Sequence, residues 1–435
     1  MRPVDAGWQE YPALADLMPW RSRGMTTGRP WAYAPQPETL RLRWDRLLQS
    51  GTGQRRDLFE EKPGRDRTID RPASPLPGFS AAGSTIAEEQ GHCPDPVMVS
   101  YRSFDRQWVI PDNRLMERAR TALWAVRSSR QIFVSEDIEP LRNGPGLIFC
   151  SFVPDIHHFH GSEASAARPL YRDAAGRSVN VTPRLLRYLS DRTGLTISAE
   201  NFLAYVAALA AHRGYTSRFS PYLTEPGVRV PLTTEADLWK ACVQTGQELI
   251  WLHTFGERCS DEAAGRPYGA LALAEMSGIR LHSPVVAHPP GMPSLIGKKE
   301  IPDSADEVNL IVGDALVGPV RKEVWEYEVN GMHVIRHWFD SRQRAPLHKK
   351  SKKGLMKENY GSWTQDLDSE LLAMLSVLNG CVQLEPRQSR LLDQVCSGNT
   401  ITTGELLQLQ VLPVPGASTK GPSPRQFGSA ALPGI

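Results

Sequence analysis

The chain has 435 residues, of which 40% are hydrophobic and 23% are charged, and its formal net charge at pH 7 is +2. This length predicts two or three hydrophobic cores, while the nearly neutral charge excludes nucleic-acid binding by a global electrostatic field, so any such affinity must come from local clusters. No apolar run is long enough to span a bilayer, and the amino terminus lacks the apolar segment of a secretory signal, so we expect a cytoplasmic protein.

Residues 1–61 form a tryptophan-rich segment. Its indoles belong to Trp8, Trp20, Trp31 and Trp44. A segment this short cannot cover four such rings alone, so we expect it to dock on another surface, such as that of a partner chain. Within it, residues 40–48 have the apolar spacing of a helix, with Arg43 and two further arginines off the apolar side. Residues 62–98 are rich in proline, glycine, serine and charge, which predicts a partly mobile linker.

Arginine and aromatic residues are densest in YRSFDRQWVIPDNRLMERARTALW, residues 101–124. The arginines are Arg102, Arg106, Arg114, Arg118 and Arg120. Arginine carries a planar fork of donors that fits phosphate and the guanine edge, and stacking on aromatic rings holds this fork in place. These residues are therefore candidates for contact with an anionic partner, and Arg106 and Arg114 are candidate readers of bases if that partner is DNA. The alternative is a strand over 107–110 and then a helix, whose arginines are solvated or paired with nearby carboxylates such as that of Asp105.

The run LIFCSFV, residues 147–153, has the length and the continuous apolar character of a strand buried on both faces. Three histidines follow it: His157, His158 and His160. Histidines this close suggest a metal-dependent hydrolase as one hypothesis. Apart from Asp155, no further ligand stands at a convincing spacing, so a hydrogen-bonded loop is the other interpretation, and we expect no metal. The six cysteines include no CxxC pair and are expected to be buried thiols.

The clearest helical patterns come next. Ser198 is placed to cap a helix whose apolar residues recur every three or four positions. A second helix is expected after Thr234, with Asp237 completing a capping box and Gly256 as the stop. We assign both helices to packing, as the scaffold of a mixed α/β core over residues 99–258.

Residues 259–306 are again rich in proline and glycine and are predicted to be a linker. The next feature, VWEYEVNGMHVIRHWF at 324–339, has alternating large residues around an Asn-Gly pair, which predicts a β-hairpin with a type I′ turn. The expected register places Val329 opposite Met332, Glu328 opposite His333, and Arg336 over Trp325. This hairpin and the basic loop after it form the expected unit 307–363.

The loop after the hairpin carries the strongest local positive charge in the chain. The DNA-contacting candidates here are Arg336, Arg342, Arg344, Lys349, Lys350, Lys352 and Lys353. A duplex carries roughly one negative charge per 1.7 Å, so a basic loop beside a rigid strand would suit a clamp on the DNA backbone. A solvated lysine loop explains the same composition.

The carboxy-terminal part has the apolar spacing of two helices, at 366–384 and 386–395, followed by a further turn at 403–409. Together they predict a short helical bundle over 364–411. Residues 412–435 contain few bulky residues and are expected to be a disordered tail. The expected fold class is therefore α+β: a DNA-reading part of mixed sheet and hairpin, a helical scaffold, and a carboxy-terminal helical bundle.

Four ordered blocks resemble one known family. They are YRSFDRQWVIPDNRLMERARTALW, GPGLIFCSFVPDIHHF, VRVPLTTEADLWKACVQTGQELIWLHTFGE and WEYEVNGMHVIRHWFDSRQR. Over most of residues 1–411, the chain resembles the carboxy-terminal specificity region of single-chain type ISP restriction-modification enzymes. Many members have proline where this chain has Ser103, a small departure. The resemblance implies recognition of a double-stranded DNA target, in a region that follows an adenine-N6 methyltransferase domain.

Motifs for covalent chemistry are not evident in the sequence. We find no FxGxG cofactor loop, no Asn/Asp-Pro-Pro-aromatic tetrapeptide and no GxxxxGK[ST] phosphate loop, and His288-Pro289-Pro290-Gly291 lacks the amide and the ring needed to hold a flipped base. We therefore expect a chain without catalysis of its own and without a cofactor, acting with a methyltransferase or nuclease-motor chain that binds S-adenosylmethionine. A degenerate S-adenosylmethionine-dependent adenine methyltransferase is the alternative, and the histidine-based hydrolase is a second one.

Overall fold

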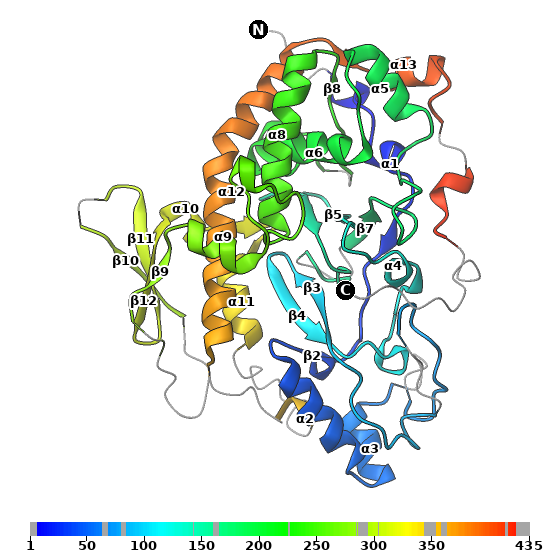
Figure 1. The fold of residues 1–435 in the computed structure, drawn as a ribbon, viewed down its shortest axis with the longest axis vertical. Coiled ribbons are helices and arrows are strands. Elements are labelled where there is room, and N and C mark those ends of the chain that lie inside the picture. Colours follow the sequence, from blue (N-terminus) through cyan, green and yellow to red (C-terminus); the bar gives the residue numbers. More distant parts are fainter. Residues whose placement is uncertain are drawn as a thin grey trace.

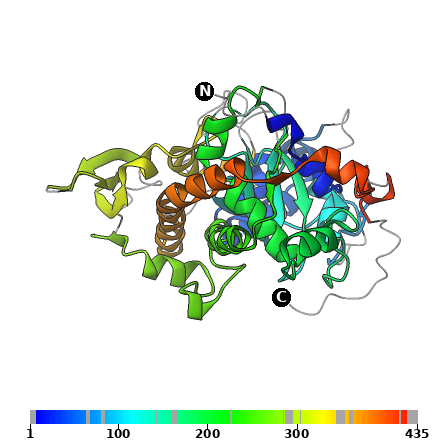
Figure 2. The ribbon, with the colours of Figure 1, turned by 90° about the horizontal axis from the view of Figure 1, so that it is seen from above.

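The computed structural model describes residues 7–62, 68–79, 84–141, 143–159, 165–224, 227–283, 285, 295–302, 304–342, 354–357, 363–413 and 416–422. In this part of the chain, helices and several small antiparallel sheets form a mixed α+β fold, as predicted. Figure 1 shows a body that contains most of the elements and a smaller sheet that projects from one side, with the long helix α12 (Gln365–Ser397) between them. Figure 2 shows the same projection from above.

The four-stranded sheet of the body has the strand order β1-β7-β5-β6, with antiparallel pairs throughout. Its strands are β1 (Ser22–Arg23), β5 (Phe133–Asp137), β6 (Leu147–Cys150) and β7 (Ser165–Pro169). All residues of β5, β6 and β7 are buried, and α8 (Ala236–His253) packs on β6. The prediction of a fully buried strand in the LIFCSFV run is confirmed, although this strand ends at Cys150 and lies at the edge of the sheet.

A second sheet of the body consists of β2 (Tyr33–Ala34), β3 (Val97–Arg102) and β4 (Asp105–Val109), in the order β2-β4-β3. Strand β4 confirms the strand predicted near 107–110. The helix expected directly after it is wrong, because residues 111–120 contain one 3-10 turn, η4 (Asn113–Leu115), before the short helix α4 (Thr121–Ala125). This stretch stays extended because the backbone of Arg118 pairs with that of Thr26.

The four amino-terminal tryptophans are buried within this chain. Trp8, Trp20, Trp31 and Trp44 are 6%, 2%, 0% and 0% exposed. The last two belong to a second hydrophobic core beneath α2 (Pro37–Leu48) and α3 (Thr52–Phe59). The expectation that these rings form a docking surface for another chain is therefore wrong, because other parts of this chain cover them. Arg43, expected off the apolar side of α2, is fully buried as well, and its Nη1 donates to the carbonyls of Trp31 and Tyr33, each at 2.8 Å.

The described residues of 62–98 are packed on the body. Ile69 and Ile86 are fully buried in the second core, and Leu76 is buried in the main core. A mobile linker is therefore a poor description of these residues. This packing could not be predicted from composition. The composition shows that the segment has few apolar residues, but it does not show that those few are buried.

The helical scaffold is built from long and short helices around α8 and α12. Its other members are α5 (Leu185–Thr193), α6 (Ala199–Ala210), α7 (Arg213–Phe219) and α13 (Thr403–Gln408). Ser198 caps α6 as predicted, since its side chain accepts the N–H of Asn201 at 3.1 Å. The capping box at Thr234 is wrong, because Glu235 is the N-cap of α8 and no side chain caps that end. Helices α6 and α8 meet closely at Gly246, where a Cβ atom would lie 1.7 Å from the Ala204 carbonyl oxygen.

Helix α12 is continuous over 33 residues, so the predicted separation into two helices at Pro386 is wrong. A proline inside a helix removes one backbone hydrogen bond and crowds the preceding turn. Here the neighbouring residue Glu385 forms an ion pair with Arg213 of α7 at 2.6 Å, and buried leucines on both sides of Pro386 pack into the core. These contacts offset the local cost. Helix α13 confirms the further turn predicted at 403–409.

The projecting sheet has the strand order β10-β11-β12-β9. Its strands are β9 (Arg280–Leu281), β10 (Leu295–Glu300), β11 (Glu307–Val312) and β12 (Ala315–Arg321). The helix α9 (Ala270–Met276) and strands β9 and β10 lie within the region expected to be a linker over 259–306. That expectation is corrected: ordinary secondary structure is present, and α9, β9 and β12 contact α12.

The type I′ turn at Asn330-Gly331 is confirmed, with φ values of 46° and 81°. Its register pairs Glu328 with His333 and Val329 with Met332, as predicted. Beyond the turn, the predicted long hairpin is wrong, because β13 (Glu328–Val329) and β14 (Met332–His333) are flanked by the helices α10 (Lys322–Trp325) and α11 (Val334–Arg342). The apolar residues after the turn also have the spacing of a buried helical face, and these residues form a helix instead of a strand.

All six cysteines are free thiols, and Cys150, Cys242 and Cys381 are buried. This agrees in part with the expectation of buried thiols, because the other three are half-buried. None of the helices in the described part of the chain combines the length and the apolar character of a membrane-crossing segment.

Candidate nucleic-acid interface

Arg102 ends strand β3 and faces Asp105 across the β3–β4 hairpin. Its guanidinium lies 3.9 Å from the centroid of the Tyr101 ring, and its Nη1 donates to Oδ1 of Asp155 at 2.9 Å. Tyr33 donates to the other carboxylate oxygen of Asp155 at 2.5 Å. Burial, reinforced by that carboxylate, raises the pKa of Tyr33 well above its usual value, so its hydroxyl remains a donor. The predicted stacking of an arginine on an aromatic ring is present. Here it holds the Arg102 guanidinium against the buried carboxylate of Asp155.

Arg342 and Arg106 are also held by carboxylates next to the β3–β4 hairpin. Arg342, at the end of α11, donates from Nη1 to Asp105 at 2.8 Å and lies 3.7 Å from the centroid of the Trp338 ring. Arg106 on β4 pairs with Glu370 of α12 at 2.7 Å. These pairs fasten the hairpin to α11 and α12.

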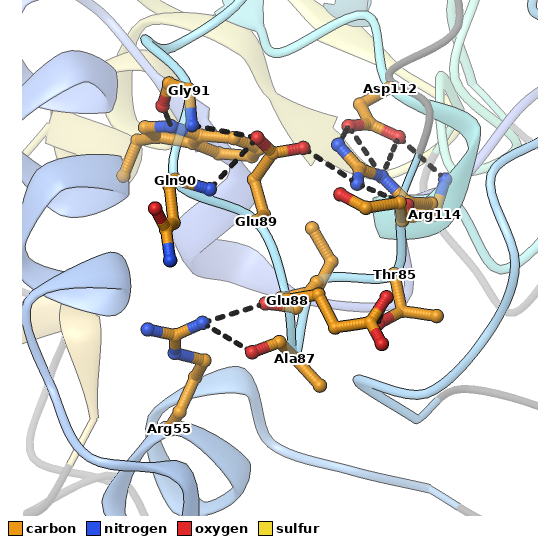
Figure 3. Close-up of polar contacts among 12 residues, drawn as sticks. Arg55, Thr85, Ala87, Glu88, Glu89, Gln90, Gly91, Asp112 and Arg114 are labelled. Atoms are coloured by element: carbon orange, nitrogen blue, oxygen red, sulfur yellow. Dashed lines mark hydrogen bonds and ion pairs between the residues drawn. The ribbon is translucent and has the colours of Figure 1, made fainter.

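Arg114 joins two carboxylates beside the second core, Asp112 at 2.6 Å and Glu89 at 2.8 Å (Figure 3). Although burial opposes ionisation, hydrogen bonds from the Gly91 N–H and from Arg114 lower the pKa of Glu89 below its usual value. Arg55 donates to two backbone carbonyls of the same segment, at 2.9 and 2.8 Å. Two arginines thus fix residues 84–91 on the body.

Arg106, Arg114 and Arg342 have little exposed surface, with side chains that are 9%, 1% and 1% exposed. A contact with DNA would require each guanidinium to leave its carboxylate, which would then be buried and unpaired. This conformation therefore does not favour the predicted DNA contacts of these three residues. The alternative interpretation, arginines paired with nearby carboxylates, describes them.

The other predicted residues have more varied surroundings. Arg118 and Arg120 are half-buried, and Arg120 precedes α4 with a left-handed φ of 55°. Arg336 is exposed on α11, and its guanidinium lies 5.3 Å from the centroid of the Trp325 ring, which confirms the predicted contact. The candidates that lie outside the described residues are Arg344, Lys349, Lys350, Lys352 and Lys353.

The described residues on either side of that basic stretch are anchored in the body. Before it, Arg342 is bound to Asp105. After it, Leu355 is fully buried in the second core, and η6 (Leu355–Lys357) packs on α2 and on η2 (Pro30–Ala32). The chain therefore enters and leaves residues 343–353 from the part of the body that holds β4, η2 and α2.

Sequence reasoning missed the cations of the projecting sheet. Lys298 and Lys299 on the edge strand β10, and Arg280 on β9, are exposed. Lys322, by contrast, forms an ion pair with Glu300 at 2.9 Å. The available signal was the lysine doublet in LIGKKE, which follows two apolar residues within a region we interpreted as a linker.

The histidine cluster gains no support as a metal site. Burial lowers the pKa of His158 to about 3, and its Nε2 lies 3.5 Å from the Cys150 sulfur. His157 is half-buried, and His160 lies outside the described residues. Among the residues that the structure describes, no group of three or more His, Cys, Asp or Glu side chains is arranged to hold a metal ion.

Comparison with known proteins identifies both a family and a shared fold. A family model described as the Type ISP C-terminal specificity domain matches residues 16–371. No curated protein matches the chain. A cryo-EM structure of a DrdV–DNA complex has a TM-score of 0.58 and 17% identity to this chain, and the match covers 90% of this chain and 38% of that one.

Two type ISP enzymes have similar structures. One is a nuclease-deletion mutant of the restriction-modification enzyme LlaGI in complex with a DNA substrate mimic, with a TM-score of 0.52, 15% identity, and coverage of 90% of this chain and 29% of that one. The other is the ATP-dependent restriction-modification enzyme LlaBIII bound to DNA, with a TM-score of 0.53, 15% identity, and coverage of 89% and 24%. At these identities the likeness shows a common fold, and this chain spans less than two fifths of each similar chain.

Proposed function

Because this chain belongs to the type ISP C-terminal specificity domain family, we propose that it recognises a target sequence in double-stranded DNA. The observation that carries this proposal is the family match over residues 16–371. The fold shared with structures of three DNA complexes supports it. The buried residues Arg106, Arg114 and Arg342 do not support the proposal, because each is paired with a carboxylate of this chain.

The exposed cations are the candidates for DNA contact. Lys298, Lys299 and Arg280 are exposed on strands of the sheet that projects from the body (Figures 1 and 2). Arg336 is exposed on α11. Cations of this kind bind phosphate and position a protein on DNA, whereas contacts with base edges supply the sequence preference.

We further propose that the covalent step belongs to a methyltransferase or nuclease-motor polypeptide that acts together with this chain. Such a polypeptide, not residues 7–422, would bind S-adenosylmethionine. The similar structures are chains more than twice as long as this one, and two of them are described as restriction-modification enzymes. Isothermal titration of this chain with S-adenosylmethionine should therefore give no binding heat, and a saturable heat would favour the degenerate methyltransferase instead.

The test of DNA recognition is a mobility-shift titration with duplex fragments at low and at moderate salt. We expect binding at low salt that weakens steeply as salt rises, because each released counterion adds to the salt dependence. Single-stranded fragments of the same sequence are the matched control and should bind more weakly. Absence of duplex binding at low salt would contradict the proposal.

A further inference from the structure

A pocket of about 420 Å³ with several charged residues in its lining opens beside β3 and η2. The charged residues that line it are Arg29, Lys62, Arg102, Arg118, Glu117 and Asp155. Arg29 is fully buried and donates to backbone carbonyls, so the cations with exposed surface are Lys62, Arg102 and Arg118. This volume lies within the usual range of small-ligand pockets, roughly 300 to 1,000 Å³. The body therefore contains a concave site with an excess of positive charge, in a chain whose net charge is nearly zero.

Asp155 contributes little negative charge to a ligand in this pocket, because its carboxylate is saturated. It is 1% exposed and accepts hydrogen bonds from Tyr33, from Arg102 and from the backbone N–H of His157 at 2.8 Å. A carboxylate with three donors is compensated where it lies. The electrostatic character of the open part of the pocket is set by the cations and by Glu117.

Arg102 is held in place with part of its guanidinium unused. Stacking on Tyr101 and the bonds of Nη1 to Asp155 and to the Tyr101 carbonyl fix the plane of the group. Within the described part of the chain, Nε and Nη2 have no hydrogen-bond partner, and neither is among the buried unpaired atoms. A fixed guanidinium edge with two free donors matches two oxygens of a phosphate group.

Lys62 supplies a second cation. Its Nζ donates to the carbonyl of Gly28 at 2.7 Å, and no described carboxylate forms an ion pair with it. A carbonyl partner positions the ammonium group, which also interacts electrostatically with the Glu60 carboxylate. Gly28 has a left-handed φ of 67°, and a Cβ there would lie 2.2 Å from Oε2 of Glu117, so glycine is required for this close approach.

We propose that the Lys62–Arg102 pocket binds a phosphate group of the DNA backbone and sets the position of the duplex without reading its sequence. This inference rests on the proposed DNA recognition. Phosphate chemistry also fits a free nucleotide, and the experiment below separates the two sources.

The experiment measures fluorescence anisotropy of labelled duplexes of several sequences with the unmodified chain and with Lys62→Ala, from low to moderate salt. Lys240→Ala is the charge-matched control, because Lys240 is 62% exposed on α8 and lies outside the pocket. We expect Lys62→Ala to weaken binding of all sequences by the same factor, about eightfold at 0.1 M salt, and to reduce the salt slope by about 0.9, the value for one lost phosphate contact. Lys240→Ala should change neither quantity. Thermal unfolding of both variants checks that the fold is retained.

The outcomes separate the two claims. If the unmodified chain binds duplexes but Lys62→Ala matches Lys240→Ala, the pocket assignment is overturned and the proposed function stands. If the unmodified chain binds no duplex, both are overturned. A third arm adds adenosine monophosphate at constant ionic strength. Binding of this nucleotide to the unmodified chain but not to Lys62→Ala, together with duplex binding that is equal for Lys62→Ala and Lys240→Ala, would assign the pocket to a free nucleotide and overturn the backbone contact.

Discussion

The β3–β4 hairpin and the projecting sheet use basic residues in opposite ways. Around the hairpin, Arg106 and Arg342 are buried against carboxylates from other elements and fasten α11 and α12 to the body. On the projecting sheet, Lys298 and Lys299 are exposed on an edge strand. The first arrangement holds the fold together, whereas the second is available to a polyanion. The difference shows that the density of arginine in a sequence does not by itself locate a DNA-binding surface.

The largest effect should come from breaking the buried pair of Arg342 and Asp105. We expect Arg342→Ala to lower the free energy of unfolding by about 3 to 5 kcal/mol, because it leaves a buried carboxylate without its partner. Urea denaturation measures this. The double variant with Asp105→Ala should lose less than the sum of the two single losses. Unchanged stability together with weaker DNA binding would show that Arg342 belongs with the DNA-contacting cations.

Asp137 is a buried carboxylate that forms no ion pair with any described residue, in contrast to Asp105. Burial raises the pKa of Asp137 from 3.8 to about 7, against hydrogen bonds from the Glu139 N–H and from Asn330. The folded state therefore favours the protonated form, so this contribution to stability is complete below pH 3.8 and is lost as the pH rises through 7. The loss is up to about 4 kcal/mol. Asp137→Asn should flatten the dependence of unfolding free energy on pH between 4 and 7, as measured by denaturation at several pH values. An unchanged pH dependence would contradict the raised pKa.

The lysines between Arg342 and Leu355 provide a test of whether cations outside the projecting sheet bind DNA. Replacing Lys349, Lys350, Lys352 and Lys353 by alanine should weaken binding to all duplexes about a hundredfold at 0.1 M salt, for two or three lost phosphate contacts at roughly 0.9 in slope each. Stability should change little, because these residues are flanked by anchored segments that the variant keeps. Anisotropy across a salt series checks both expectations, and a salt slope equal to that of the unmodified chain would exclude these lysines from the interface.

The smallest effect is expected on the projecting sheet. Replacing Lys298 and Lys299 by alanine should weaken duplex binding about eightfold at 0.1 M salt if the pair makes one phosphate contact. The unfolding free energy should stay within about 0.5 kcal/mol, since both side chains are exposed. The same anisotropy assay measures this, and Lys322→Ala, which removes a cation paired with Glu300, is the matched control. Equal losses in the two variants would argue against a direct role for the edge strand.

Several elements could be predicted from the sequence because a few residues close together in the chain determine each of them. The Ser198 cap, the type I′ turn at Asn330-Gly331 and the buried strand β6 depend on neighbours along the chain. The resemblance of four sequence blocks identified the family, which the match over residues 16–371 confirms.

The remaining features depend on partners far along the chain. Arg106 meets Glu370 across 264 residues, and Arg342 meets Asp105 across 237, so their burial could not be read from local composition. The strand predicted over α11 is wrong because the apolar spacing of this segment fits both a strand and a helix over a short length. Likewise, the continuity of α12 through Pro386 depends on packing from several other helices.

The most direct test of target recognition is selection of bound duplexes from a pool with a randomised central segment, followed by sequencing. A specificity domain should enrich one short motif, and fragments carrying it should bind more tightly than the unselected pool at moderate salt. Recovery of a pool as random as the starting one, despite binding at low salt, would show that the chain holds DNA by its backbone alone and would contradict target recognition.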